Sequence, residues 1–300
     1  MPVPNESVCT SEEFACNPVF LTARILDPEL IKSIDHLKVS DVWERGDPYE
    51  QYVGRWSRRV APQFLSWLGI PERKRWLDVG CGTGALCASI LDQCSPTSLV
   101  GVDPSEGFLQ KAQEQLGGRV ILKRGGADQI PLSDGSVDVT VSALVLNFVP
   151  DQPAAVSEMA RVTVDRGTIG AYVWDYAEKM DLMRLFWDTV VELNPEAAAM
   201  DEGVRFPVCH PEALAELFAN SGLRGVEVTA IDILTPFADF EDYWKPFLGG
   251  QGAAPAYAMA LEEAARTCLR ERIRLKIRPE ADGSIGLKAR AWAVRGTVVR

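Results

Sequence analysis

Three glycines and two aspartates in the first half of the chain have the types and spacing of a ligand-binding site. The segment Trp76–Leu86 reads WLDVGCGTGAL and places Gly80, Gly82 and Gly84 between an apolar run and a helical pattern. Glycines in such a tight turn let the backbone approach a ligand with no Cβ in the way. Because Gly80-x-Gly82-x-x-Ala85 also satisfies the dinucleotide fingerprint, the glycines by themselves leave the ligand open.

The two aspartates narrow the choice of ligand. Asp78 lies two residues before the first glycine, where a carboxylate would repel the diphosphate of a dinucleotide and favour a cationic group. Asp103 ends the next apolar run, 19 residues after Gly84, and a carboxylate there can accept both hydroxyls of a ribose. A cationic amino acid joined to a nucleoside without phosphates is S-adenosylmethionine. We therefore expect S-adenosylmethionine as the cofactor, with S-adenosylhomocysteine as its product.

Short β-rich runs alternate with helical patterns around these residues, which is typical of βαβ units and a mostly parallel sheet. Apolar residues at helical spacing predict helices before the first strand and after several of the others, including 211–220 and 257–275. The expected strands cover residues 75–79, 99–102, 120–123, 137–142, 168–173, 226–234 and 285–294.

With these elements and motifs, the chain resembles the class I S-adenosylmethionine-dependent methyltransferases, in particular the small-molecule type 11 or ubiquinone-biosynthesis-like group. The resemblance covers residues 48–300 in outline and is most specific over 76–175. It implies an α/β fold: a Rossmann-like three-layer sandwich with a seven-stranded, mostly parallel sheet whose last strand is antiparallel. We expect this domain over residues 46–300, after an N-terminal arm at 1–45.

The resemblance also implies roles at the cofactor site. Asp78 and the glycine turn would hold the methionine end, Asp103 the ribose, and Ala127 the adenine through its backbone, while 142–144 would lie near the sulfonium. The full expected cofactor set is Tyr52, Asp78, Gly80, Cys81, Gly82, Gly84, Asp103, Pro104, Gly126, Ala127, Asp128, Ser142 and Leu144.

One position departs from the family pattern. Where the family usually reads Gly-Asp-Ala after the third strand, this chain has Gly125-Gly126-Ala127. The carboxylate that meets the adenine amino group is therefore missing at Gly126, and Asp128 is the candidate to replace it.

Aromatic residues are candidates for the acceptor subsite. Trp56 lies just before the first strand, where an aromatic face would favour the sulfonium; ordinary helix packing is the alternative. An aromatic, glycine-rich run at about 236–256, which includes Trp244, is typical of a lid over an apolar substrate, with core packing as the alternative. Trp174 and Arg205 complete the expected substrate set.

Methyl transfer from a sulfonium depends on alignment and on exclusion of water, and a general base is needed only if the acceptor must first lose a proton. His210 is the best titratable candidate for that base, and Tyr176, just after the fifth strand, is the next. Hydrogen bonding at a helix start is the alternative role of His210.

Composition limits the partners. The net charge is -11, from 42 acidic and 31 basic residues, which disfavours nucleic acids and anionic membranes and leaves a small-molecule acceptor. The spacing of seven cysteines and two histidines suggests neither a metal site nor a disulfide framework. Because no segment reads as a secretory signal or approaches the ~20 apolar residues of a membrane span, we expect a cytoplasmic protein. The oligomeric state stays open.

Function is expected to be methyl transfer from S-adenosylmethionine to a small, apolar or aromatic acceptor. An NAD-dependent oxidoreductase is one alternative, which Asp78 opposes, and a non-catalytic S-adenosylmethionine-binding regulator is another. Methylation of nucleic acid is disfavoured because residues 142–145 read SALV rather than the Pro-Pro-aromatic tetrapeptide of amino-group base methylases. Neither the acceptor nor the methylated atom follows from the cofactor motif.

Overall fold

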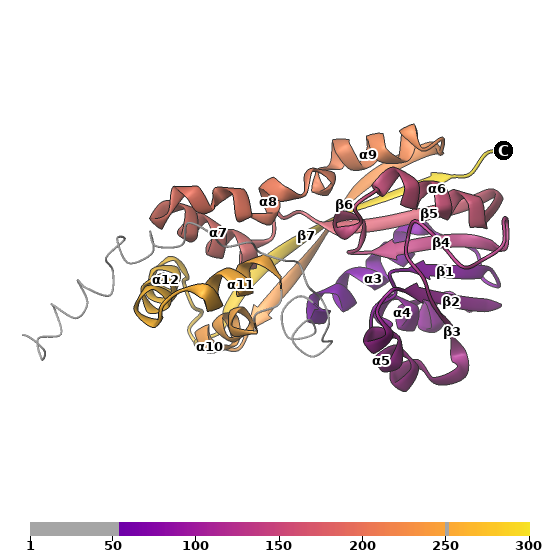
Figure 1. The fold of residues 1–300 in the computed structure, drawn as a ribbon. Helices are drawn as coiled ribbons and strands as arrows, with labels where there is room; N and C mark the ends of the chain where they lie inside the picture. Colours follow the sequence, from indigo (N-terminus) through magenta and orange to yellow (C-terminus); the bar gives the residue numbers. More distant parts are fainter. Residues whose placement is uncertain (1–53, 250–251) are drawn as a thin grey trace, which may run out of the picture.

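One seven-stranded sheet organises the chain (Figure 1). A computed structural model describes residues 54–249 and 252–300, so the expected arm at 1–45 and the cofactor candidate Tyr52 lie outside the described residues. The strand order is β3-β2-β1-β4-β5-β7-β6. Pairing is parallel from β3 through β5, and β7 is antiparallel to both β5 and β6. The expected α/β fold with an antiparallel last strand is therefore confirmed.

The strands follow the expected apolar runs. They are β1 (Arg75–Val79), β2 (Ser98–Asp103), β3 (Ile121–Arg124), β4 (Val137–Ala143), β5 (Thr163–Trp174), β6 (Arg224–Phe237) and β7 (Ile285–Thr297). β1, β2 and β4 are buried along most of their length, as expected for central parallel strands covered on both faces. Because these strands are parallel, their carboxyl ends meet at one edge of the sheet, where the glycine turn begins.

The helices differ from expectation in several places, since α7, α8 and α10 were not expected and one expected helix is divided. They are α3 (Arg55–Leu68), α4 (Ala85–Gln93), α5 (Glu106–Leu116), α6 (Gln152–Val162), α7 (Asp181–Leu193), α8 (Glu202–Arg205), α9 (Pro211–Asn220), α10 (Phe240–Trp244), α11 (Ala253–Ala260) and α12 (Glu263–Lys276). The single helix expected at 257–275 is wrong, because Leu261 and Glu262 are extended (ψ 140° and 151°) and separate α11 from α12. α7 was not expected; no side chain caps its start at Met180.

The β6–β7 pair extends beyond the rest of the sheet and carries a helical lobe, made of α7, α8, α10, α11 and α12. β5 pairs with β7 only as far as Ala291, whereas β6 stays paired down to Ile285. Figure 1 shows these helices gathered around the extension, apart from those that cover the parallel strands. Aromatic rings form the core of the lobe: Phe186 of α7 stacks on Phe247 with ring centres 4.6 Å apart.

The aromatic run that suggested a lid belongs to this core. Phe237, Tyr243 and Phe247 are at most 1% exposed. The Tyr243 hydroxyl donates a hydrogen bond to the carbonyl of Leu182 in α7, at 3.1 Å. Core packing therefore accounts for these rings, and movement of the segment over a ligand stays a prediction.

Removing the Phe186 ring should destabilise the lobe. We expect Phe186→Ala to lower the free energy of unfolding by roughly 3–5 kcal/mol, because it leaves a cavity against Phe247. Urea unfolding followed by circular dichroism measures the change. The control is Leu275→Ala, whose side chain is 73% exposed and should cost no more than about 0.5 kcal/mol. Equal losses for the two variants would contradict the aromatic core.

Candidate functional site

The glycine turn after β1 has the backbone that its sequence predicts. Gly80, Gly82 and Gly84 have φ of 72°, 52° and 91°, in the left-handed region that favours glycine. A Cβ at Gly80 would collide with the side chain of Val145, and one at Gly84 would lie 2.5 Å from Leu116. A Cβ at Gly82 would meet nothing within 4 Å. Of the three glycines, Gly82 therefore opens onto space that a ligand can occupy.

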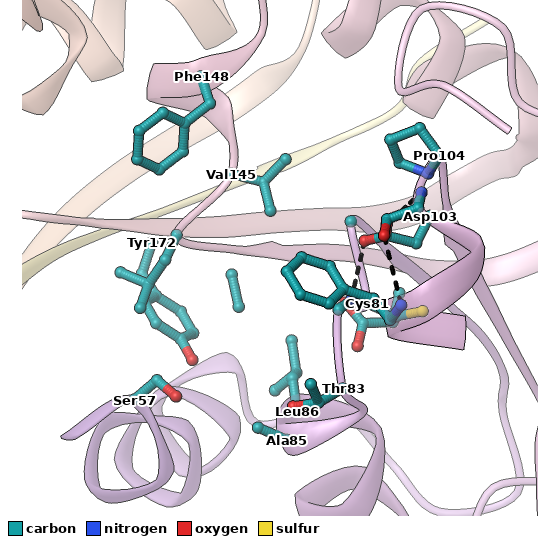
Figure 2. A pocket seen from close by; sticks show the side chains of 17 residues that line it. Ser57, Cys81, Thr83, Ala85, Leu86, Asp103, Pro104, Val145, Phe148 and Tyr172 are labelled. Carbon is teal, nitrogen blue, oxygen red and sulfur yellow. Dashed lines mark hydrogen bonds between the residues drawn. The ribbon is translucent and has the colours of Figure 1, made fainter. Parts of the chain in front are cut away.

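A cavity of about 310 Å³ lies at this edge of the sheet. Figure 2 shows Asp103 and Pro104 on one side of it and Val145, Phe148 and Tyr172 on another. Expected cofactor residues in its lining are Asp78, Gly80, Cys81, Gly82, Asp103, Pro104 and Leu144. Lining residues outside the expected set are Ser57, Thr83, Ala85, Leu86, Ser105, Phe108, Ala143, Val145, Phe148 and Tyr172.

Asp78 places a buried carboxyl group beside the glycine turn. Its side chain is fully buried, and Oδ2 accepts a hydrogen bond from the Cys87 thiol at 3.2 Å. Its Oδ1 has no hydrogen-bond partner among the described residues. Burial raises the pKa of Asp78 to about 7, because the charged form loses its hydration. A cationic group in the cavity would give Oδ1 a partner and favour the ionised carboxylate.

Asp103 is held in place by backbone donors. Its Oδ1 accepts from the N–H of Ser105 at 2.8 Å and its Oδ2 from the N–H of Gly82 at 3.0 Å (Figure 2). Burial raises its pKa, while these two donors oppose the shift. Each carboxylate oxygen keeps a further lone pair. The oriented side chain can therefore accept hydrogen bonds from a diol such as ribose.

The end of β4 supplies the opposite wall. Leu144 has a left-handed backbone (φ 60°), and its N–H donates to the carbonyl of Tyr172 at 2.8 Å. Non-glycine residues in this region are uncommon and tend to occur at functional sites. Ser142 lies two residues earlier, in β4, and its hydroxyl donates a hydrogen bond to the carbonyl of Val79 at 2.9 Å. Ser142 therefore links β4 to β1 and does not line the cavity.

The loop after β3 carries the departure from the family pattern. The N–H of Gln129 donates to the carbonyl of Gly126 at 3.3 Å and closes a turn. Asp128 Oδ1 lies 2.5 Å from the position that a Cβ at Gly126 would take. The carboxylate of Asp128 thus lies where a side chain at residue 126 would begin. This is the place expected if Asp128 replaces the carboxylate that is missing at Gly126. Neither residue nor Ala127 lines the cavity, so their contact with adenine stays a prediction.

A row of aromatic rings leads away from the cavity. Phe148, in its lining, lies 5.3 Å from Phe206, which lies 5.8 Å from Tyr176 (ring centres). The guanidinium carbon of Arg205 is 5.1 Å from the ring centre of Phe206. Tyr176 and Arg205 therefore approach the cavity through Phe206 and do not line it.

The remaining candidates lie outside the cavity lining. His210 precedes α9, where its side chain makes no capping hydrogen bond. Trp174 ends β5 and is 1% exposed, Trp244 is buried in the lobe, and Trp56 packs on Phe237 at 5.2 Å. Their catalytic and substrate roles stay predictions.

Two further features concern the described ranges 54–249 and 252–300. No three or more His, Cys, Asp and Glu side chains gather there as metal ligands would. The helices in these ranges lack the combination of length and apolar character that a bilayer crossing requires.

Comparison with known proteins supports a methyltransferase domain in part of the chain. A sequence model described as a methyltransferase domain matches residues 77–170, which contain the glycine turn and most of β1–β5. Over residues 77–170 the chain is therefore similar to methyltransferase domains.

Two other proteins of known sequence and one solved structure are also similar to this chain. Malonyl-[acyl-carrier protein] O-methyltransferase of Geobacter sulfurreducens is 33% identical over 140 residues, 45% of this chain and 52% of that protein. Trans-aconitate 2-methyltransferase of Deinococcus radiodurans is 28% identical over 202 residues, 63% and 72% of the two chains. The YcgJ protein of Bacillus subtilis shares the fold, with a TM-score of 0.51 at 18% identity over 82% and 99% of the chains. The match thus spans about half the length of the first relative.

Cofactor affinity should depend on pH through Asp78. Because its pKa is about 7, a cationic ligand should bind about tenfold more tightly at pH 8 than at pH 6, where most of the carboxyl is protonated. Titration calorimetry with S-adenosylhomocysteine measures the dissociation constants. Stability of the unliganded protein should change in the opposite sense, falling from about pH 4 to pH 7, because the folded carboxyl binds more protons than the unfolded one.

Two variants separate Asp78 from its neighbour. Asp78→Asn should weaken binding and remove the pH dependence, whereas Asp103→Asn should weaken binding and retain it. A pH dependence that survives in Asp78→Asn would show that another group titrates.

Proposed function

We propose that this protein transfers a methyl group from S-adenosylmethionine to a small-molecule acceptor. The observation that carries the proposal is the buried carboxyl of Asp78, a residue in the cavity lining, whose Oδ1 has no hydrogen-bond partner among the described residues. A cationic ligand end suits this group, and a diphosphate does not. The methyltransferase family match and the acids at both strand ends support the same cofactor.

Each part of the cavity has a separate task in this proposal. The cofactor, when bound, supplies a methyl group on a positively charged sulfur, activated for transfer to a nucleophile. Asp78 binds the ammonium end, and Asp103 accepts from the ribose hydroxyls. Gly82 gives the ligand room, since any side chain there would enter the cavity. The apolar wall of Val145 and Phe148 excludes water from the reacting atoms.

The reacting end of the acceptor is proposed to bind beside Phe148, at the start of the ring row that includes Phe206 and Tyr176. Aromatic faces suit flat or apolar acceptors and also stabilise a nearby cation. Two relatives are named for malonyl-[acyl-carrier protein] and trans-aconitate, and both names describe acids. A small acceptor that joins an apolar body to an acidic group fits both observations. If it must lose a proton, Tyr176 and His210 are the proposed bases.

Cofactor binding is the first test. Gly82→Arg should abolish S-adenosylhomocysteine binding in calorimetry, because its side chain must enter the cavity, and Asp103→Ala should weaken binding at least tenfold. The matched control is Gly117→Arg, since Gly117 also has a left-handed backbone (φ 61°) and a Cβ there also meets nothing within 4 Å, but Gly117 lies outside the cavity lining. Wild-type affinity in Gly82→Arg would refute the proposed site.

Two measurements separate this function from its alternatives. S-adenosylhomocysteine should raise the melting temperature and NADH should not; the reverse result would favour an oxidoreductase. Incubation with methyl-labelled S-adenosylmethionine and a panel of small acids, phenols and amines, followed by mass spectrometry, should yield a labelled product. Tight cofactor binding without product from any acceptor class would favour a non-catalytic regulator.

A further inference from the structure

A second group of polar side chains lies outside the cavity lining, where the first turn of α3 meets β6 and α10. The guanidinium carbon of Arg55 is 4.3 Å from the ring centre of Trp56 and 4.7 Å from that of Phe237. Its Nη1 donates to Asp242 Oδ1 at 2.9 Å. Two rings and one acid therefore fix the plane and the direction of this guanidinium.

The other edge of the Arg55 guanidinium is buried and unpaired. Nε and Nη2 make no hydrogen bond to any residue that the structure describes. The same holds for the indole Nε1 of Trp56, a residue only 3% exposed, and for the hydroxyl of Thr235, which is 1% exposed. Thr235 lies two residues before Phe237 on the same buried face of β6. Buried donors of this kind are costly unless something accepts from them, above all where they carry charge.

Other arginines of this chain show what such an edge binds. Arg75 holds both oxygens of Asp138 with Nε and Nη2, at 3.1 and 2.7 Å. Arg290 holds Asp232 with the same two atoms, at 2.7 and 2.9 Å. The edge presents two parallel N–H groups at the spacing of the two oxygens of a carboxylate. Arg55 presents this edge with its Nη1 already anchored on Asp242.

The local charge also favours an anion. Arg59, one helical turn after Arg55, has its guanidinium carbon 5.6 Å from the ring centre of Trp56. Its Nη1 donates to the carbonyl of Leu234 at 3.1 Å. Among the described residues, Asp242 is the acid that pairs with these two arginines, so one of the two positive charges has no acidic partner there.

We propose that Arg55, with Trp56 and Arg59, forms a subsite for a carboxylate of the methyl acceptor. The proposal rests on the proposed function. Ser57, two residues after Arg55, lines the cofactor cavity from another side of α3, so the bound acceptor would reach from the cavity around the first turn of this helix. Both oxygens of the bound carboxylate accept hydrogen bonds from the Arg55 edge, which lowers their nucleophilicity. The carboxylate is therefore a handle that positions the acceptor, and another atom of the acceptor receives the methyl group.

Arginine Nε–H resonances test this subsite directly. Nitrogen-15-labelled protein saturated with S-adenosylhomocysteine is titrated with succinate and benzoate, and in parallel with succinamide and benzamide. The Arg55 resonance is assigned by its loss in Arg55→Lys. We expect a saturable shift with the acids and none with the amides. No shift with either acid, or equal shifts with acids and amides, would overturn the proposal.

Controls separate the carboxylate from other anions and from a folding defect. The matched control is Arg278→Lys, an exposed arginine in the segment after α12, which should leave the titration unchanged. Inorganic phosphate that shifts Arg55 at the same concentrations as the acids would indicate a general anion site and overturn the carboxylate assignment. If Arg55→Lys does not fold, the Trp56 Nε1 resonance, assigned with Trp56→Phe, provides the same readout.

Kinetics extend the test to the acceptor. With an acid that the wild-type enzyme methylates, Arg55→Lys should raise KM for the acceptor at least about tenfold and change kcat little, because the lost fork holds a non-reacting group. An unchanged KM for the acceptor in Arg55→Lys would overturn the proposal that Arg55 binds a carboxylate of the acceptor. Calorimetry with S-adenosylhomocysteine should give wild-type affinity for Arg55→Lys. Absence of cofactor binding in the wild type would refute the proposed function, whereas the acid titration repeated without cofactor would still report on the subsite.

Discussion

The site depends on one carboxyl group buried at the end of a central parallel strand. Asp78 has strands on both sides and a helix beyond, and the Cys87 thiol is its hydrogen-bond donor. Burial without full compensation is unfavourable for a charge and raises the pKa of this carboxyl, so a cationic ligand would favour its ionised form. In the proposed site, the glycine turn leaves the space in which a cation would contact the Asp78 carboxyl. The burial of this carboxyl and the proposed binding of a cation are thus linked by the same electrostatic constraint.

The turn and the wall opposite it constrain each other. The Val145 side chain occupies the volume that a Cβ at residue 80 would need, and Leu144 reaches its position with a left-handed backbone. Strain at the end of β4 and the glycine at the end of β1 therefore belong to one packing arrangement. Close approach of these two strand ends narrows the cavity to a size suited to a single small ligand.

The chain has two parts, the segment that matches the methyltransferase family and the helical lobe outside it. The segment that matches the methyltransferase family, residues 77–170, contains Asp78 and Asp103. α3 precedes this segment, and the lobe carried by the β6–β7 extension follows it. The Arg55 edge forms where these two outer parts meet, through Asp242 and Phe237. The proposed cofactor site thus lies in the matched segment, and the proposed acceptor handle lies outside it.

Much of the fold and of the candidate cofactor site could be predicted from the sequence, because these features depend on local chemistry. The left-handed turn at Gly80–Gly84, the strand before it and the placement of Asp103 follow from backbone sterics and apolar periodicity over a few residues. The end of α11 at Leu261 did not follow, since helical spacing of apolar residues continues across the break. α7 was missed although apolar residues at helical spacing, such as Leu182, Phe186 and Val190, mark it in the sequence.

Only the tertiary structure decided which distant side chains meet. The sequence indicated aromatic residues near 236–256 but not that they pack on α7, because the choice between lid and core depends on the surface they face. It likewise gave no sign that Phe148 and Tyr172 line the cavity or that Asp242 anchors Arg55 across 187 positions of the chain. Contacts of that kind arise from packing between whole elements, which local pattern does not encode. The sequence determined the cofactor turn, and the three-dimensional packing determined what surrounds it.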